Sequence, residues 1–337
     1  MSLKVGIVGF GRIGRALFRL GFDRPGIEFV AICDDGDADS LLYLLNHSTV
    51  EGAFDSPARL VGNHIVDGSQ RARIMKQSKP GAVPWDSLGV DYVFDCTGEY
   101  RTEKELSKHC EAGARLVISS TPSSDASIPV IVRGVNCAGV TGDEVIISCG
   151  SSSIHALSLV LKVLIDGPGV DAATMTSVHA YTGNQHLSDS ASVSLRWSRS
   201  AAQNIIPNET WAPEVASSLL PKLNGKIDGL ALNVPVAAGS NIDLVTKLGK
   251  ALSVEEVNAL FLEASQGAMK GLMGYTDAPI VSSDVIGDRH SALFDSNATL
   301  SMESGLVKTL AWFDNGWAFA ERMLETAEIH AIRGGAL

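Results

Sequence analysis

The stretch that decides the fold class is Val5-Gly6-Ile7-Val8-Gly9-Phe10-Gly11-Arg12-Ile13-Gly14. A short β-rich run, Lys4–Val8, leads into a Gly-x-Gly-x-x-Gly string, and a helical pattern over Arg12–Phe22 follows. In such a unit the first glycine permits a tight turn, the second lets the backbone approach a pyrophosphate, and the third lets helix and strand pack closely. The N–H groups at the helix start would bind the phosphates. We therefore expect a dinucleotide-binding α/β domain whose cofactor contacts include Gly9, Gly11, Arg12 and Ile13.

An acidic residue at the end of the next strand supports this prediction. Asp34 follows the apolar run Glu28–Cys33 and lies 20 residues after Gly14. A carboxylate at this position binds the ribose hydroxyls of the cofactor, and it would repel a 2′-phosphate, so NAD is predicted rather than NADP. The alternative is a surface aspartate in a turn before Asp35-Gly36.

The first half of the chain alternates between strand and helix patterns. Alternation of this kind is typical of a mostly parallel sheet covered by helices on both faces. The further strands are expected at Asp91–Asp95, Arg115–Ser119, Pro129–Val132 and Val145–Ser148, and a helix at Thr102–Glu111.

The second half has longer strands with partial alternation, which indicates a mostly antiparallel sheet packed on helices. A long polar segment, Tyr181–Ile206, carries few structure signals, and a loop of that length is usually functional. The expected domains are an NAD-binding Rossmann domain at 1–151, an α+β catalytic domain at 152–315 and a C-terminal helix at 316–337 that returns to the first domain. The elements expected here are helices at Ser151–Ile165 and Trp317 to about Ala331, and strands at Ala173–Ala180, Ile227–Val234, Asn241–Leu248 and Leu306–Phe313.

Composition limits the class of partner and the compartment. The 337 residues carry 27 Lys and Arg against 38 Asp and Glu, a net charge of −11. An acidic chain does not provide the basic face that a nucleic acid or an anionic membrane requires. No run of about 18 uncharged apolar residues is present, and the first strand leaves no room for a signal peptide. We expect a cytoplasmic protein with reduced thiols.

The five cysteines raise the question of a nucleophile. Their spacings match no metal-binding pattern, so no metal site is expected. They are Cys33, Cys96, Cys110, Cys137 and Cys149.

From end to end, the chain resembles the phosphorylating glyceraldehyde-3-phosphate dehydrogenase family. The order and spacing of the matching stretches also agree with that family. These stretches are VGIVGFGRIGR at the start, Cys96-Thr97-Gly98, SVHAYTGNQ at Ser177–Gln185, AQNIIP at Ala202–Pro207, LPKLNGKIDGLALNVPV at Leu220–Val236, GYTDAPIVSSD at Gly274–Asp284 and AWFDN at Ala311–Asn315.

The resemblance implies a glycolytic oxidoreductase that converts a phosphorylated small aldehyde to an acyl phosphate with NAD and inorganic phosphate. It also implies a homotetramer, with Tyr181–Ile206 as a loop at the cofactor site and subunit interface. Three further cofactor contacts come from the same resemblance: Thr97, Ser120 and Asn315, the last at the nicotinamide carboxamide. Without it, each of them could simply cap a helix or end a strand.

The family's nucleophile is a cysteine at a helix N-terminus, but this chain differs there. Where the family reads Ser-Asn-Ala-Ser-Cys-Thr-Thr-Asn, the chain reads Ser148-Cys149-Gly150-Ser151-Ser152-Ser153-Ile154-His155. Ser152 therefore occupies the nucleophile position. Cys149 lies three residues earlier, where we expect a small buried thiol rather than a displaced nucleophile. His179 matches the catalytic histidine, the alternative being a structural histidine at a strand end. At His155 we expect either a cation that favours anions or a solvent-facing residue.

Three explanations of Ser152 remain open. The serine can be an engineered replacement, it can mark a natural paralogue that lost thiol chemistry, or it can work with His179 as a Ser–His pair. The third is the weakest, since a serine hydroxyl is far less acidic than a thiol, whose ordinary pKa is about 8.5.

The anion sites that the resemblance implies are altered as well. The family holds the substrate phosphate with an arginine where this chain has Asn233, so a charge-assisted contact is lost. Trp211 follows Thr210 where the family has glycine. The runner-up function is therefore a non-catalytic NAD-binding paralogue that acts as a sensor, scaffold or hetero-oligomer partner. The substrate and phosphate contacts expected are Ser151, Ser153, Thr182, Arg199, Thr210 and Asn233.

Overall fold

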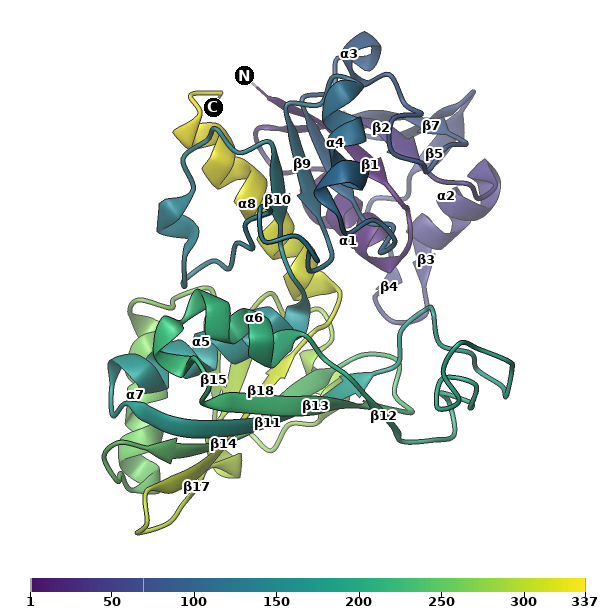
Figure 1. The fold of residues 1–337 in the computed structure, drawn as a ribbon. Coiled ribbons are helices and arrows are strands. Elements are labelled where there is room, and N and C mark those ends of the chain that lie inside the picture. The colour runs from purple at the N-terminus through teal and green to yellow at the C-terminus, as the bar shows by residue number, and fades with distance from the viewer. Residues whose placement is uncertain (1, 69, 337) are drawn as a thin grey trace. The chain divides into compact units, whose positions relative to one another are not determined.

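The computed structural model describes residues 2–68 and 70–336, and the chain forms two compact units. One unit runs to Ser151 and includes the chain from Phe319 onward, and the other is Ser152–Ala318. Figure 1 shows both units and labels most of their helices and strands.

The first unit is built on an eight-stranded sheet in the order β10-β9-β8-β1-β2-β7-β6-β5. The strands from β10 to β7 pair in parallel, and β7, β6 and β5 continue as antiparallel neighbours. A separate pair, β3 (His47–Ser48) and β4 (Gly52–Ala53), lies outside it. The strands are β1 (Leu3–Val8), β2 (Ile27–Cys33), β5 (Arg59–Val61), β6 (His64–Asp67), β7 (Gln70–Met75), β8 (Tyr92–Asp95), β9 (Leu116–Ser119) and β10 (Ile146–Ser148).

Helices cover both faces of this sheet. Trp85 of α3 and Leu106 of α4 belong to a buried cluster that contains Val8, so these helices share Val8's face. Gly14 of α1 lies against Ile7, which points the opposite way, and Gly21 lies against Leu324 of α8. The parallel sheet is therefore enclosed, as expected for a Rossmann-type domain. The helices are α1 (Arg12–Gly21), α2 (Ala38–Asn46), α3 (Trp85–Leu88), α4 (Glu103–Glu111) and α8 (Trp317–Arg333).

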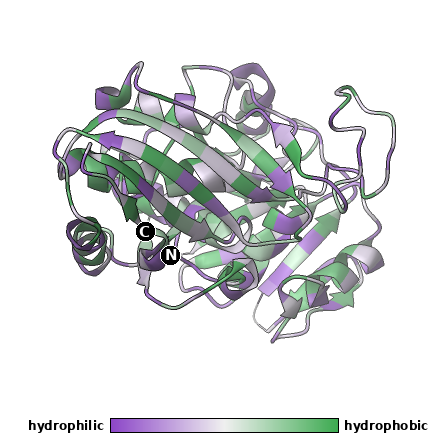
Figure 2. Cartoon of the chain, turned by 90° about the horizontal axis from the view of Figure 1, so that it is seen from below, coloured by the Kyte–Doolittle hydropathy of each residue, from purple (hydrophilic) through white to green (hydrophobic). Residues whose placement is uncertain are grey.

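The second unit has a mixed, mostly antiparallel sheet in the order β12-β13-β11-β14-β18-β16-β15, with β17 beside β18. Hydrophobic and hydrophilic residues alternate along its long strands (Figure 2). The expected α+β architecture is confirmed. The elements are α5 (Ser152–Asp166), β11 (Val170–Ala180), β12 (Ile206–Asn208), α6 (Ala212–Leu219), β13 (Ile227–Val234), β14 (Ser240–Leu248), α7 (Val254–Gln266), β15 (Met273–Thr276), β16 (Ala292–Asp295), β17 (Leu300–Ser301) and β18 (Leu306–Phe313).

Two local expectations need correction. The strand expected at Pro129–Val132 is a single bridge between Val130 and Ser148. Proline at its start has no N–H to donate, which limits pairing there. The antiparallel strands β5–β7 were not predicted from the sequence, because they are short and carry exposed charged residues such as Arg71 and Arg73. The long segment after β11 is described throughout, and it forms no helix or strand before Ile206.

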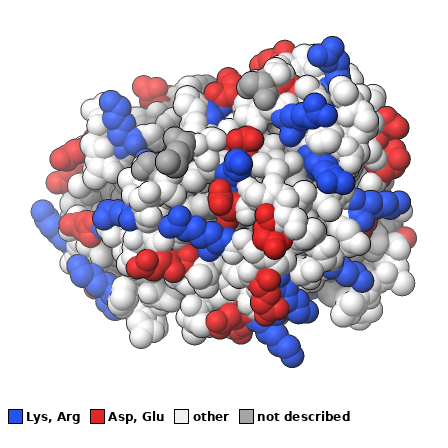
Figure 3. All heavy atoms as spheres, turned by 90° about the horizontal axis from the view of Figure 1, so that it is seen from above, with Lys and Arg blue, Asp and Glu red and all other residues white. Residues whose placement is uncertain are grey.

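The length of the helices and the distribution of surface charge indicate whether the chain could cross a membrane or bind a polyanion. No helix in the described part of the chain is long and apolar enough to cross a membrane. On the face drawn in Figure 3, acidic and basic side chains are interspersed. The described residues on that face therefore form no continuous basic surface.

Candidate cofactor and catalytic site

The glycine turn after β1 has the geometry that its three glycines require. Gly9 has a φ of +84°, and a Cβ built on it would lie 2.8 Å from the backbone of Cys96 and of Thr97. A Cβ on Gly14 would lie 2.3 Å from the Gly9 carbonyl oxygen, whereas one on Gly11 would have no described atom within 4 Å. Gly11 precedes α1 without a side-chain cap. The turn therefore leaves space at the start of α1, where helix N–H groups point toward a pyrophosphate in folds of this kind.

Asp34 lies beside this turn. Its Oδ2 accepts a hydrogen bond from the Phe10 N–H at 2.7 Å, and its Oδ1 accepts one from the Gly36 N–H at 2.8 Å. The carboxylate is therefore fixed between the ends of β1 and β2, half-buried, with lone pairs remaining for ribose hydroxyls.

Thr97 and Ser120 follow the two strands on the other side of β1. Their strands, β8 and β9, run parallel to β1 in the same sheet, so both residues and Gly9 lie at the same carboxyl-end edge. Thr97 donates from its N–H and its hydroxyl to Asp95 Oδ1, and the Ser120 N–H donates to the Asp95 carbonyl. Ligands of open α/β sheets bind at this edge.

Asn315 has a buried side-chain amide and lies near the C-terminal end of the second unit. It is 5% exposed, and among the described residues neither its Oδ1 nor its Nδ2 has a hydrogen-bond partner. A buried amide without partners is costly. A carboxamide ligand would satisfy both atoms, which fits the nicotinamide contact expected for this residue.

Ser152 is the first residue of α5, and it is half-buried. The turn before it depends on Gly150, whose φ is +67°. The buried Ser153 hydroxyl lies 3.4 Å from the hydroxyl of Ser177 on β11, so the first turn of α5 packs on this strand. Ser152 is therefore at the positive end of a 15-residue helix.

His179 lies two residues after Ser177 on the same strand, so both side chains point to the face that carries the start of α5. Its Nδ1 is 2.6 Å from the carbonyl oxygen of Ala180, and its ring is edge-on to Phe313. Because a carbonyl only accepts, Nδ1 carries the proton and Nε2 of the neutral ring has the lone pair. His179 is thus in the tautomer that a general base needs.

Asn233 is next to His179 in the sheet, and its hydrogen-bond partner is a neutral amide. The two residues are register partners on β13 and β11. Asn233 is 6% exposed, and its Oδ1 accepts a hydrogen bond from Asn208 at 3.4 Å. Asn208 in turn accepts one from the Trp197 indole at 3.1 Å. Asn208 and Trp197 were not predicted from the sequence, since the pairing of β12 with β13 has no local signature.

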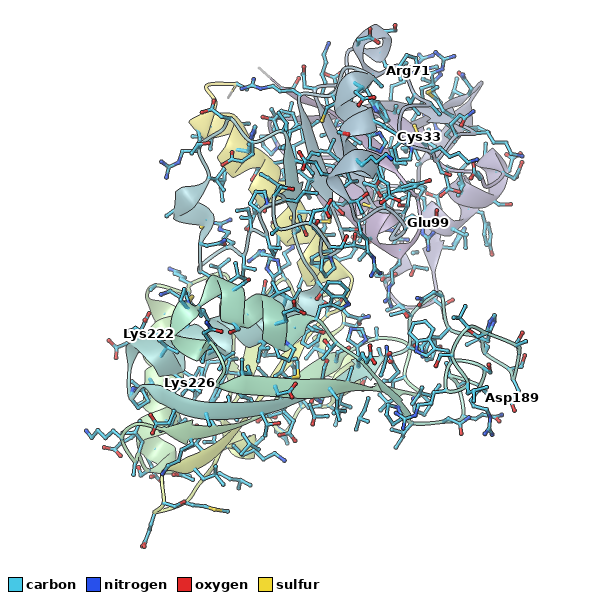
Figure 4. All side chains as sticks on the ribbon, viewed as in Figure 1. Cys33, Arg71, Glu99, Asp189, Lys222 and Lys226 are labelled. Atoms are coloured by element: carbon cyan, nitrogen blue, oxygen red, sulfur yellow. The ribbon has the colours of Figure 1, made fainter. Side chains whose placement is uncertain are left out.

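The remaining anion-site candidates are local caps or exposed. The Thr182 hydroxyl donates to Asn184, and the Thr210 hydroxyl accepts from the Ala212 N–H at 3.2 Å. Arg199 pairs with Asp189 at 3.3 Å, with both side chains more than 60% exposed. Figure 4 shows Asp189 on the outer part of the long loop.

Burial makes most of the thiols poor nucleophiles. Desolvation raises the pKa of the Cys33 and Cys149 thiols to about 12, and it also raises the pKa of Cys96 and Cys110. Cys33 lies inside the first unit (Figure 4). Cys149 is fully buried, with its sulfur 3.7 Å from the Thr326 hydroxyl of α8. These thiols remain protonated at neutral pH.

The expectation that His155 faces solvent is wrong. The side chain is 1% exposed, inside α5's buried face. A histidine is large enough to reach into the core from the start of the helix, and the all-round apolar character of this helix hides which face is covered.

Comparison with known proteins agrees with this geometry. The profile described as "Glyceraldehyde 3-phosphate dehydrogenase, NAD binding domain" matches residues 3–103, and that of the C-terminal domain of the same enzyme matches residues 148–315. The chain belongs to the glyceraldehyde-3-phosphate dehydrogenase family. NAD is therefore the cofactor.

Relatives in this family cover nearly the whole chain. The glyceraldehyde-3-phosphate dehydrogenase of Mycobacterium leprae is 41% identical over 96% of this chain and 97% of its own length. The glyceraldehyde-3-phosphate dehydrogenase 1 of Bacillus subtilis is 38% identical over 99% and 100%. The enzyme of Podospora anserina is 38% identical over 96% of both. The members of this family are NAD-dependent phosphorylating oxidoreductases.

Gly11→Ala and Gly14→Ala should separate cofactor contact from packing. Gly14→Ala places a methyl against the Gly9 carbonyl and should cost about 1–3 kcal/mol of unfolding free energy as well as NAD affinity. Gly11→Ala meets no described atom and should keep the stability but weaken NAD binding. Chemical denaturation and calorimetric NAD titration measure the two effects. Unchanged NAD affinity in Gly11→Ala would contradict the pyrophosphate contact.

Asp34→Ala should weaken NAD binding by about tenfold and improve the relative affinity for NADP, since the carboxylate that repels a 2′-phosphate is gone. Asp35→Ala is the matched control, because this exposed neighbour accepts a hydrogen bond from the Ser78 hydroxyl at 2.6 Å, away from the glycine turn. Equal cofactor preference in the two variants would remove Asp34 from the ribose site.

Proposed function

We propose that this protein is an NAD-dependent oxidoreductase that acts on a small aldehyde and passes the acyl group to inorganic phosphate, with turnover limited by Ser152. The single observation that carries this proposal is the contact of the start of α5 with Ser177, which lies two residues before His179 on the same face of β11. Bound NAD would supply the hydride acceptor. The protein's own residues hold the aldehyde and handle the proton.

The cofactor contacts follow from the edge of the first sheet. Gly9, Gly11, Arg12 and Ile13 surround the pyrophosphate at the start of α1, and Asp34 binds the ribose hydroxyls. Thr97 and Ser120 line the neighbouring strand ends. Asn315 bonds the carboxamide, which would satisfy an amide that has no described partner.

Ser152 and His179 are the catalytic pair in this proposal. His179 Nε2 takes the proton of the attacking group, and the helix N-terminus stabilises developing negative charge. A thiol at this position would be largely ionised near neutral pH, since helix N-termini lower the pKa of a thiol. A hydroxyl has no comparable anion, and an ester resists phosphate more than a thioester does. Hence we expect slow turnover in the unsubstituted protein.

In this proposal, the inorganic phosphate binds at the start of α5 and at the turns that carry Thr182 and Thr210. Ser151, Ser153, Thr182 and Thr210 supply hydroxyls, and helix N–H groups supply further donors. Arg199 is the cationic ligand of the phosphate in this proposal. Its guanidinium would have to leave Asp189 to bind the anion. Both partners are exposed, so that exchange costs little.

Asn233 contacts the substrate tail in this proposal. Its partner Asn208 is neutral, and the chain from Trp197 through Asn208 to Asn233 carries no charge. A phosphorylated tail would find no cation among these three residues. The aldehyde that fits this surface is small and polar, and the phosphorylated substrate implied by the resemblance is bound weakly.

We also propose a cytoplasmic homotetramer with a place in glycolysis. The long loop presents apolar side chains to solvent, with Val193 and Leu195 almost fully exposed. Exposed apolar side chains on one loop mark an interaction surface. Light scattering after size exclusion measures the assembly.

A non-catalytic NAD-binding role is the second candidate. Ser152 at the nucleophile position and the uncharged Asn233 both favour it. In that case the protein acts as a sensor, a scaffold or a partner of an active dehydrogenase.

Ser152→Cys should raise NADH formation from NAD, phosphate and a small aldehyde by about three orders of magnitude or more, because it supplies an ionisable nucleophile beside His179. Ser158→Cys is the matched control and should not raise NADH formation, since this serine lies on the same helix, fully buried and away from its start. No turnover of any aldehyde by Ser152→Cys, with NAD still bound, would favour the non-catalytic role.

Asn233→Arg should shift specificity toward phosphorylated aldehydes. In the Ser152→Cys background, we expect the ratio of kcat/KM for a phosphorylated aldehyde over its unphosphorylated analogue to rise about tenfold, because a charge-assisted fork replaces a neutral amide. Asn233→Gln keeps the site neutral and should leave the ratio unchanged. An unchanged ratio in Asn233→Arg would place the substrate tail elsewhere.

A further inference from the structure

A buried polar chain runs beneath the carboxyl-end edge of the first sheet. Trp85 of α3 and His109 of α4 are completely buried, and Asp95 at the end of β8 is 1% exposed. None of the three is among the expected cofactor contacts. A buried carboxylate is costly, so a core position of this kind usually holds an apolar residue unless the charge has a use.

The hydrogen bond from Trp85 determines the tautomer of His109. The Trp85 indole N–H donates to His109 Nδ1 at 3.1 Å. Because an indole nitrogen only donates, Nδ1 must have the lone pair, and the proton of the ring is on Nε2. This Nε2 lies 3.4 Å from Asp95 Oδ2, and among the described residues neither atom has a hydrogen-bond partner. The two groups therefore meet in a buried electrostatic contact rather than in a hydrogen bond.

The other oxygen of Asp95 shapes the turn that follows β8. Oδ1 accepts from the Thr97 N–H at 3.0 Å and from the Thr97 hydroxyl at 2.6 Å. The Cys96 N–H donates to the Val8 carbonyl, which holds the turn against β1. A Cβ on Gly9 would touch the Cys96–Thr97 backbone at 2.8 Å. The Asp95 carboxylate thus holds in place the Cys96–Thr97 backbone, against which Gly9, the first glycine of the cofactor turn, packs.

We propose that His109 and Asp95 are positioning residues for NAD: Trp85 fixes the proton of His109, His109 holds the Asp95 carboxylate, and Asp95 holds the Thr97 turn against Gly9. None of the three touches the cofactor. This inference rests on NAD occupying the Gly9–Gly14 turn, as in the proposed function. The chain acts on cofactor affinity through the shape of that turn.

Asp95→Asn tests the Trp85–His109–Asp95 contacts, because it replaces an acceptor oxygen with an amide donor. If the amide oxygen keeps Thr97, the amide N–H₂ faces the Nε2–H of His109, so two donors oppose each other. The ring cannot move its proton to Nδ1 while Trp85 donates there. We expect the Kd for NAD, measured by calorimetry, to rise about tenfold.

Trp85→Phe in the Asp95→Asn background should restore binding. Without the indole donor, His109 can move its proton to Nδ1 and accept from the amide with Nε2. We expect the double variant to bind NAD within about threefold of Trp85→Phe alone. A purely structural role for these residues predicts the opposite, namely that the second core substitution weakens binding further.

Tyr92→Phe is the matched control. It removes a buried hydrogen bond, 2.8 Å from the Tyr92 hydroxyl to His330 Nδ1, on the same strand but at its other end. The Tm should fall while the Kd for NAD stays unchanged. His109→Leu is a second variant that leaves Asp95 chemically intact, and its Kd should rise several-fold.

Three results would overturn the inference. The first is an unchanged Kd in both Asp95→Asn and His109→Leu, and the second is a loss of affinity in Tyr92→Phe as large as theirs. The third is a lack of recovery in the double variant. If the unsubstituted protein does not bind NAD, the cofactor assignment fails, and this inference fails with it.

Discussion

The cofactor edge of the first unit depends on how closely three backbone segments approach one another at Gly9. The carbonyl oxygen of Gly9 lies only 2.3 Å from where a Cβ of Gly14 would be, and the Cys96–Thr97 peptide lies only 2.8 Å from where a Cβ of Gly9 would be. No side chain fits between these segments, so β1, α1 and the turn after β8 have one arrangement. That arrangement places the uncapped start of α1 beside Asp34 and leaves the space at Gly11 open.

In the second unit, the chemistry depends on one helix start. The contact between Ser153 and Ser177 brings the first turn of α5 to the strand that carries His179. In our proposal, the scaffold for a nucleophile consists of this helix N-terminus and a histidine in the tautomer of a base. Residue 152 is a serine rather than an ionisable thiol, and burial keeps the Cys33 and Cys149 thiols protonated.

The fold could be predicted well from the sequence, because glycine spacing and strand–helix alternation are local signals. The strands β13 and β18 were predicted with their bounds, whereas β5–β7 were missed because short charged strands resemble loops. Site residues that are brought together by segments distant in the sequence were harder to predict. Asn208 reaches Asn233 only through the register of β12 with β13, and His109 reaches Asp95 only through the packing of α4 on β8. The prediction that His155 faces solvent was wrong because the sequence of a helix that is apolar on all sides does not show which face is covered.

In our proposal, the thiol chemistry of the family is absent from this chain although its scaffold is present. Intact-protein mass spectrometry after incubation with NAD and a small aldehyde, without phosphate, tests this most directly. In the absence of an acyl acceptor, a competent nucleophile would remain acylated. We predict that no cysteine of the unsubstituted protein is acylated, and that any adduct that forms slowly is an ester on Ser152. An acyl adduct that peptide mapping places on any of the five cysteines would contradict the proposal.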